Sequence, residues 1–106
     1  MKRYTGCRTG NGVNVTVDGM PLDPRRDLRN HSPTGFEWGY GGSGPAQLAL
    51  AILADHPGDD SEALAHYQKF KWGVVANLPL EGWTLSSEDI EHGIRRLFSN
   101  EGKARA

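Results

Sequence analysis

The segment at residues 39–45, Gly-Tyr-Gly-Gly-Ser-Gly-Pro, constrains the fold more than any other feature of the chain. Its glycines disfavour regular helix and strand alike, so this stretch is expected to be a loop. Directly after it, residues 46–54 are mostly alanine, leucine and isoleucine, the composition of a slim helix that can lie close to its neighbours. Pro45 suits the first turn of that helix, where its missing N–H costs nothing. We therefore predict a helix from Gly44 or Pro45 to about His56, ended by a Pro-Gly pair.

The N-terminal part of the chain predicts a β-hairpin. Residues 3–8 and 13–17 have the composition of strands, and the second alternates valine with polar residues, which places its valines on one face. Between them, Thr9-Gly10-Asn11-Gly12 contains Asn-Gly, the strongest short-range hairpin signal, because both positions tolerate a positive φ. Met20-Pro21-Leu22 has the length and position of a short return strand.

Two further helices and one strand are expected after residue 59. Apolar residues recur at helical spacing over 60–78, and Asp59 stands three residues before a glutamate, the pattern of a capping box. Trp83-Thr84-Leu85 is expected to form a short strand that joins the N-terminal hairpin. Ser86 or Ser87 then caps a third helix. The apolar face of that helix is made by Ile90, Ile94, Leu97 and Phe98.

Together these elements predict a single compact α+β domain over residues 1–98. In it, a small antiparallel sheet, formed by the N-terminal hairpin and the short later strand, packs against about three helices. The polar residues 99–106 are expected to form a frayed C-terminal tail.

Charge, cysteine content and hydropathy limit the setting of the protein. A formal net charge of -1 over 106 residues creates no bulk field for nucleic acid or a membrane, so nucleic acid is disfavoured as a partner. Cys7 is the single cysteine, so an intramolecular disulfide is excluded. We expect it to be a half-buried strand residue. The longest apolar run, 46–54, is far too short to cross a bilayer. We expect a cytoplasmic protein that does not contact a membrane.

Residues 23–42 follow neither a strand nor a helix period, because proline, glycine, asparagine and serine interrupt every candidate element. A stretch of this length inside a small domain is usually either functional or disordered. Phe36, Trp38 and Tyr40 offer large apolar areas to bury, which argues against disorder. We predict an ordered loop packed on the core.

The glycine-rich loop is a candidate anion site. The N–H groups of Gly41 to Gly44 can turn toward a common point, and the following helix adds free donors and the positive end of its dipole. Gly39-x-Gly41-x-x-Gly44 matches the dinucleotide-binding spacing, but neither a βαβ unit nor the Gly-Lys-Ser/Thr of a Walker A loop accompanies it. The favoured alternative is a tight connection in which glycine lets the chain pass between packed aromatic residues. Ser43 or Gly44 would cap the helix, with Gln47 placed to support the cap.

Three arginines at 25–29 precede this loop and form a second candidate anion site. Guanidinium groups bind phosphate and carboxylate in a bidentate manner. Asp23 and Asp27 lie among them, however, so local ion pairing is the favoured alternative. If the two segments meet in space, Arg29 and His31 are expected to face the glycine loop.

Metal binding and catalysis have weaker support. Glu62 with His66 and Glu88 with His92 lie one helical turn apart, which invites a metal interpretation, but ordinary surface pairs explain them. We predict neither a metal nor a cofactor. Glu37 can act as a base only if its aromatic neighbours desolvate it.

A long central run, residues 30–50 (NHSPTGFEWGYGGSGPAQLAL), resembles the signature of a domain-of-unknown-function family of short proteins from bacteria and their phages. The resemblance extends upstream through Val17-Asp18-Gly19 and Leu22, and downstream through residues 67–72 and 83–85. It implies no activity, cofactor or catalytic residue. It implies a mobile-element setting, and with it a partner-binding role such as interference with host defence.

Two hypotheses follow. The first is a small non-enzymatic accessory protein that binds a partner through residues 25–47. The partner is a macromolecule, above all a protein such as one of the host, or a small anionic ligand. The second is an enzyme acting on a nucleotide or phosphorylated substrate held at the Gly41–Gly44 loop, with His31 or Glu37 as acid or base. On the first hypothesis, Trp38→Ala or Arg29→Ala is expected to abolish binding with little loss of stability. The residues expected to carry binding are Arg29, His31, Glu37, Trp38, Tyr40, Gly41, Gly42, Ser43, Gly44 and Gln47.

Overall fold

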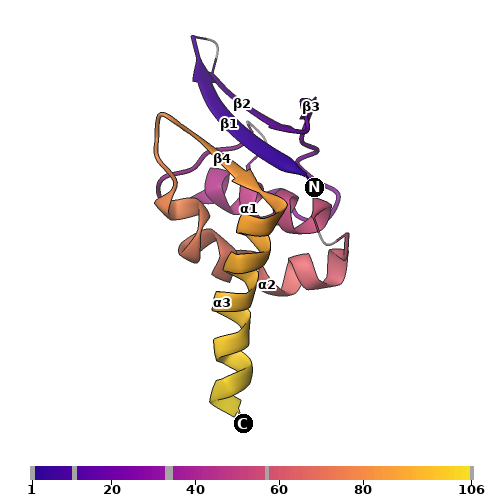
Figure 1. Cartoon of the computed structure of the whole chain (residues 1–106). Helices are drawn as coiled ribbons and strands as arrows, with labels where there is room; N and C mark the ends of the chain where they lie inside the picture. Colours follow the sequence, from indigo (N-terminus) through magenta and orange to yellow (C-terminus); the bar gives the residue numbers. More distant parts are fainter. Residues whose placement is uncertain (1, 11, 33–34, 57, 106) are drawn as a thin grey trace.

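A four-stranded antiparallel sheet lies over a layer of helices in the computed structural model, which describes residues 2–10, 12–32, 35–56 and 58–105, with side chains through residue 97 (Figure 1). The fold is therefore α+β, as the sequence predicts. The elements in chain order are β1 (Arg3–Thr9), β2 (Gly12–Val17), β3 (Met20–Pro21), α1 (Ser43–Asp55), α2 (Asp60–Gly73), the 3₁₀ helix η1 (Val75–Asn77), β4 (Gly82–Ser86) and α3 (Ser87–Arg105).

The sheet has the strand order β3-β2-β1-β4, so the N-terminal hairpin is at its centre. The β1–β2 ladder ends at the pair Thr9↔Gly12, which confirms the predicted hairpin, although Asn11 itself is outside the described residues. β4 pairs antiparallel with β1, as expected for the segment around Trp83. The return strand is also confirmed, since Met20 pairs with Val17 in β3.

Strand alternation decides which side chains face the helices. Tyr4 and Gly6 of β1 are buried, and the register places them beside Val17 and Val15 of β2. Cys7 points the other way and is exposed, so the expectation of a half-buried cysteine was wrong. The reason is its odd position in β1, which puts it on the outer face of the sheet.

Helix α1 is the centre of the core. Every residue from Gly44 to Ala54 is buried, and Figure 1 shows α1 lying between the sheet and α2. A helix that is apolar all round must be covered on all sides, which explains its alanine-rich composition. The N-cap is Gly42, in extended conformation, and Ser43 is the first helical residue. The prediction that Ser43 or Gly44 caps the helix was therefore wrong.

Helix α2 begins as predicted but ends earlier. Asp59 caps it by accepting a hydrogen bond from the N–H of Glu62 at 3.1 Å. The predicted helix to Leu78 is wrong, because α2 stops at Gly73 and continues only as η1. Glycine disfavours helix, and a β-carbon at Gly73 would lie 2.7 Å from the side chain of Leu97 in α3. The side-chain amide of Asn77 donates to the carbonyl oxygens of Trp72 and Gly73, which the broken helix leaves free.

Helix α3 follows β4 without a linker. The Ser86 hydroxyl accepts from the N–H of Asp89 at 3.1 Å, and the Asp89 carboxylate accepts from the N–H of Ser86 at 3.0 Å. This reciprocal capping box fixes the helix start at the predicted serine pair. α3 runs to Arg105 and so includes most of the segment expected to be a polar tail; Figure 1 shows its end projecting away from the sheet. No helix in the described part of the chain has the length and apolar character needed to span a membrane.

Gly6 lies at a tightly packed position of the sheet. A β-carbon added at Gly6 would lie 2.4 Å from the indole of Trp83, which stands opposite it in β4. We expect Gly6→Ala to lower the free energy of unfolding by about 1–3 kcal/mol, the usual cost of overpacking a core. Urea denaturation monitored by tryptophan fluorescence measures this loss.

Gly10→Ala is the matched control. A β-carbon at Gly10 meets nothing within 4 Å, and its backbone φ is not positive. We expect this variant to change the free energy of unfolding by less than about 0.5 kcal/mol. Equal losses in the two variants would contradict the packing explanation.

Candidate functional site

The side chain of Gln47 in α1 organises the segment that precedes the glycine loop. It is fully buried, and its Oε1 accepts hydrogen bonds from the N–H groups of His31 at 2.7 Å and Ser32 at 3.1 Å. Its Nε2 donates to the carbonyl oxygens of Pro24 at 2.6 Å and Arg29 at 3.0 Å. Both N–H donors and both acceptor positions of the amide are thus hydrogen-bonded to backbone groups.

This arrangement changes the role expected for Gln47. The sequence suggested a surface contact or support for the helix cap, but the side chain is an internal anchor with 0% exposure. Because two N–H groups must face oxygen and two carbonyls must face nitrogen, the amide has one orientation only. The segment from Pro24 to Ser32 is therefore ordered without regular secondary structure, as predicted for this part of the loop.

Two of the three arginine side chains of this segment are engaged within the protein. Arg25 forms ion pairs with Asp27 at 3.1 Å and with Asp60 of α2 at 2.9 Å, which supports the local-pairing interpretation over a free anion site. Arg26 donates to the carbonyl of Ser32. Arg29 is exposed, and its carbonyl binds Gln47.

His31 turns toward α2 rather than toward the glycine loop. Its Nε2 is hydrogen-bonded to the hydroxyl of Tyr67, and the two rings are 5.3 Å apart. Neither His31 nor Arg29 is among the residues that line the cleft at the glycine loop. The juxtaposition expected for these two residues was therefore wrong, because Gln47 draws their backbone onto α1.

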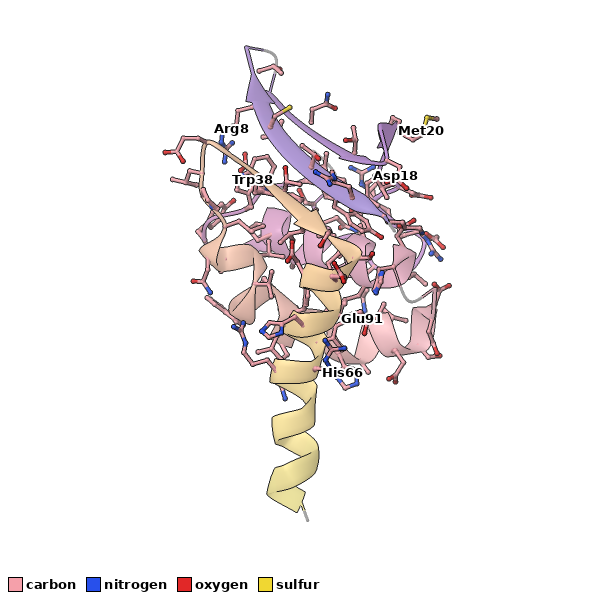
Figure 2. All side chains as sticks on the ribbon, viewed as in Figure 1. Arg8, Asp18, Met20, Trp38, His66 and Glu91 are labelled. Carbon is pink, nitrogen blue, oxygen red and sulfur yellow. The ribbon has the colours of Figure 1, made fainter. Side chains whose placement is uncertain are left out.

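Arg8, at the end of β1, is the cation beside the glycine loop. Its Nη2 and Nη1 donate to the two oxygens of Glu37 at 2.8 and 3.1 Å, and its Nε donates to the carbonyl of Leu80. Strand alternation supplies the signal that sequence reasoning missed, since Arg8 shares the inward face of β1 with Tyr4 and Gly6. Figure 2 shows Arg8 directed toward Trp38.

The ion pair fixes the charge state of Glu37. The hydrogen bond from Arg8 holds the pKa of Glu37 below its ordinary value of 4.5, against the opposing effect of partial burial. The same bond raises the pKa of Arg8. Glu37 is therefore a carboxylate at neutral pH, and a poor proton acceptor.

Trp38 belongs to the core rather than to an exposed surface. Its side chain has 0% exposure, its Nε1 donates to the carbonyl of Leu80 at 3.2 Å, and its ring meets that of Trp83 edge to face at 5.6 Å. The Arg8 guanidinium covers the ring at 4.7 Å. The expectation that Trp38→Ala spares stability was wrong, because removing a buried tryptophan leaves a large cavity.

The glycines of the loop allow close contacts with neighbouring side chains. Gly39 has a φ of +87° and donates its N–H to the carbonyl of Val75 in η1 at 3.0 Å. β-carbons added at Gly41, Gly42 and Gly44 would lie 2.2 Å from Trp72, 2.6 Å from Tyr40 and 2.7 Å from Glu37. This agrees with the close-packing interpretation of the loop.

Three large apolar side chains remain exposed around this loop, and we call them the Trp72 surface: Tyr40, Trp72 and Leu80, exposed by 51%, 60% and 54%. All three border the glycine loop: Trp72 lies on Gly41, Leu80 lies on Gly39, and Tyr40 is the residue between these two glycines, with its ring on Gly42. The sequence pointed to Tyr40 but missed Trp72 and Leu80. Both come from other parts of the chain, and no local pattern indicates that they are exposed.

A shallow cleft of about 370 Å³ adjoins this surface at the start of α1. The Arg8–Glu37 ion pair lies along it, with Tyr40 at its edge. Within the described residues, no group of three or more histidine, cysteine, aspartate or glutamate side chains is arranged to hold a metal ion. The residues lining the cleft are Arg8, Thr9, Gly12, Val13, Ser32, Gly35, Phe36, Glu37, Tyr40, Ser43 and Gly44.

The fold and this surface define a small α+β protein that exposes apolar side chains around a tightly packed glycine loop. The chain belongs to the family of unknown function DUF6166, whose family model matches residues 4–96. No curated protein and no solved structure was found to match it.

The Gln47 anchor leads to a stability prediction. Gln47→Leu keeps similar volume but leaves four backbone groups without their partner, each costing about 1–3 kcal/mol where it stays buried. Allowing for partial rehydration of the loop, we expect a loss of about 3–5 kcal/mol in the free energy of unfolding, measured by urea denaturation. Gln68→Leu, the same change at an exposed position of α2, should cost less than about 0.5 kcal/mol. A small effect at Gln47 would show that the loop does not depend on this amide.

The Arg8–Glu37 pair leads to a pH prediction. Because the folded-state pKa of Glu37 is lowered, the pair stabilises the protein above the ordinary pKa of 4.5, and this contribution disappears as the pH falls through the folded-state value. The stability difference between wild type and Glu37→Gln should therefore be larger at about pH 7 than at about pH 3. Asp27, whose pKa is also lowered by Arg25, titrates in both proteins and cancels in the difference. A pH-independent difference would refute the coupling.

Proposed function

We propose that the protein is a non-enzymatic accessory protein that captures a partner protein through the Trp72 surface. The convergence of three exposed apolar side chains on one glycine-rich turn carries this proposal. Isolated exposed apolar residues are ordinary, but contiguous ones mark interaction sites. Tryptophan, tyrosine and arginine are the residue types that dominate binding energy at interfaces. Arg8 donates to the carbonyl of Leu80 and lines the cleft together with Tyr40.

The packing beneath the surface supports the same function. Trp72 and Leu80 rest on glycine backbone, and Gly39 is hydrogen-bonded to η1. These contacts restrict the exposed side chains before a partner arrives, so less conformational entropy is lost on binding. A preorganised surface of this kind binds a partner at a lower entropic cost than a loop that must fold on contact.

A protein partner fits the charges at the site better than a small anion does. Arg8, the cation at the cleft, is already neutralised by Glu37, so an incoming phosphate would meet a carboxylate. The enzymatic alternative would need an acid or base in the cleft. His31 is turned to Tyr67, and Glu37 is held ionised by Arg8, so neither side chain is placed for that role.

The resemblance seen in the sequence supports a setting for this activity. Kinship with short bacterial and phage proteins suggests a mobile-element product whose partner is a protein of the bacterial host, with interference in host defence as the outcome. The proposed binding site is then the Trp72 surface, together with the Arg8–Glu37 pair, instead of the whole segment 25–47.

Affinity capture from a bacterial host lysate tests the proposal. We expect Trp72→Ala and Tyr40→Ala to lose captured proteins that the wild type retains, because each removes a large exposed contact. Met20→Ala is the matched control, since Met20 is 67% exposed and lies at the far side of the sheet from Arg8 and Trp38 in Figure 2. Unchanged thermal unfolding of the variants confirms that folding is not the cause. Equal capture by wild type and Trp72→Ala would contradict the proposal.

A thermal-shift screen with nucleotides and phosphosugars tests the enzymatic and small-anion alternatives. A ligand at a hundred times its dissociation constant adds about 2.7 kcal/mol to the folded state, which such a screen detects easily. We expect no shift. A clear shift that Ser43→Ala and Arg8→Ala abolish would favour the alternative instead.

A further inference from the structure

Lys71 of α2 is a buried cation at the Trp72 surface. The residue is only 8% exposed, and its ammonium nitrogen lies 4.4 Å from the centre of the Trp72 ring. Lysine is rarely this buried unless a carboxylate compensates it. In the part of the chain that the structure describes, the ammonium has the ring as its neighbour and no acidic partner.

Other cations of the protein pair with acids, unlike Lys71 among the described residues. Lys2 pairs with Asp55, and Arg8 with Glu37, although both cations are far more exposed than Lys71. Two acidic groups, Glu37 and Glu81, lie at the Leu80 end of the surface, and their charges act on Arg8. Among the described residues, Arg96 adds a second cation at the Trp72 end, where its guanidinium donates to the carbonyl of Gly73.

We propose that the partner presents an acidic apolar peptide segment, in which a carboxylate side chain binds the Lys71 ammonium beside an apolar side chain on Trp72. The inference rests on the proposed function and specifies the chemistry of the partner. Lys71, which has no acidic partner among the described residues, selects an acid at the Trp72 end, while Glu81 disfavours one at the Leu80 end, where Glu37 is paired with Arg8.

Peptide selection tests this directly. A displayed library of random peptides is panned on the immobilised wild-type protein, Lys71→Met and Arg29→Met. Methionine keeps the aliphatic volume of lysine, and Arg29 is an exposed cation outside the cleft, which makes it the matched control. We expect wild type and Arg29→Met to enrich aspartate or glutamate next to an aromatic or aliphatic residue. Lys71→Met should keep the apolar preference and lose the acidic one.

Single-peptide binding makes the result quantitative. For a selected peptide, changing its aspartate to asparagine should weaken binding to wild type by roughly 10- to 100-fold, the range for a hydrogen bond between charged groups. The same change should have little effect on binding to Lys71→Met, so that the two changes are not additive. The peptide change leaves the protein intact, and therefore decides the matter even if Lys71→Met fails to fold.

The remaining outcomes overturn the inference. Selected peptides that need Trp72 but contain no acidic preference would refute the role of Lys71 and leave the proposed function standing. Failure to select any peptide whose binding depends on Trp72 would count against both. Binding of poly-dT or inorganic phosphate that depends on Lys71 and is tighter than that of the best peptide would assign the cation to another ligand class.

Discussion

The carboxamide of Gln47 joins two parts of the chain that otherwise have no regular connection. It lies in helix α1, which is buried from Gly44 to Ala54, and binds backbone groups of Pro24, Arg29, His31 and Ser32. Backbone polar groups that face the core outside a helix or strand need another partner. One side chain does so here for the segment that leads into the glycine loop. The position of that loop, and of Trp38 and Tyr40 within it, follows from this anchor.

Glycine has the complementary role at the surface. Where the chain passes Trp72, Tyr40 and Glu37, the missing β-carbons allow the backbone to touch these side chains. The exposed side chains of Trp72 and Leu80 therefore lie directly on the loop backbone, and the buried Trp38 belongs to the same loop. The Trp72 surface and the hydrophobic core are thus built on neighbouring residues of the same loop.

Much of the architecture could be predicted because its signals are local. The Asn-Gly turn, the alanine-rich run of α1, the capping residues Asp59 and Ser86, and the strand at Trp83 each depend on neighbours within a few positions. α2 was extended too far because its end depends on Leu97 of α3, packed against Gly73. Gly73 is itself a local signal for the helix end, because glycine disfavours helix, but its contact with Leu97 cannot be read from the sequence of α2.

The candidate site was harder for the same reason. Gln47 was assigned to the surface, and Arg8 was overlooked, since their partners lie between 15 and 72 residues away in the chain. Trp38 and Trp72 have the same side chain, yet one is buried and the other exposed, and only the tertiary arrangement distinguishes them. The sequence indicated the right region of the molecule but not which of its residues reach the solvent.

The hydrogen bond from Gly39 to Val75 has a consequence for the dynamics of this protein. It ties the glycine loop to the short turn that separates Trp72 from Leu80, so both flanks of the exposed surface are held through one point. Local opening of that point would release Trp38 from the core at the same time, because Trp38 is the residue next to Gly39. Opening of this surface is therefore expected to be coupled to opening of the core beneath it.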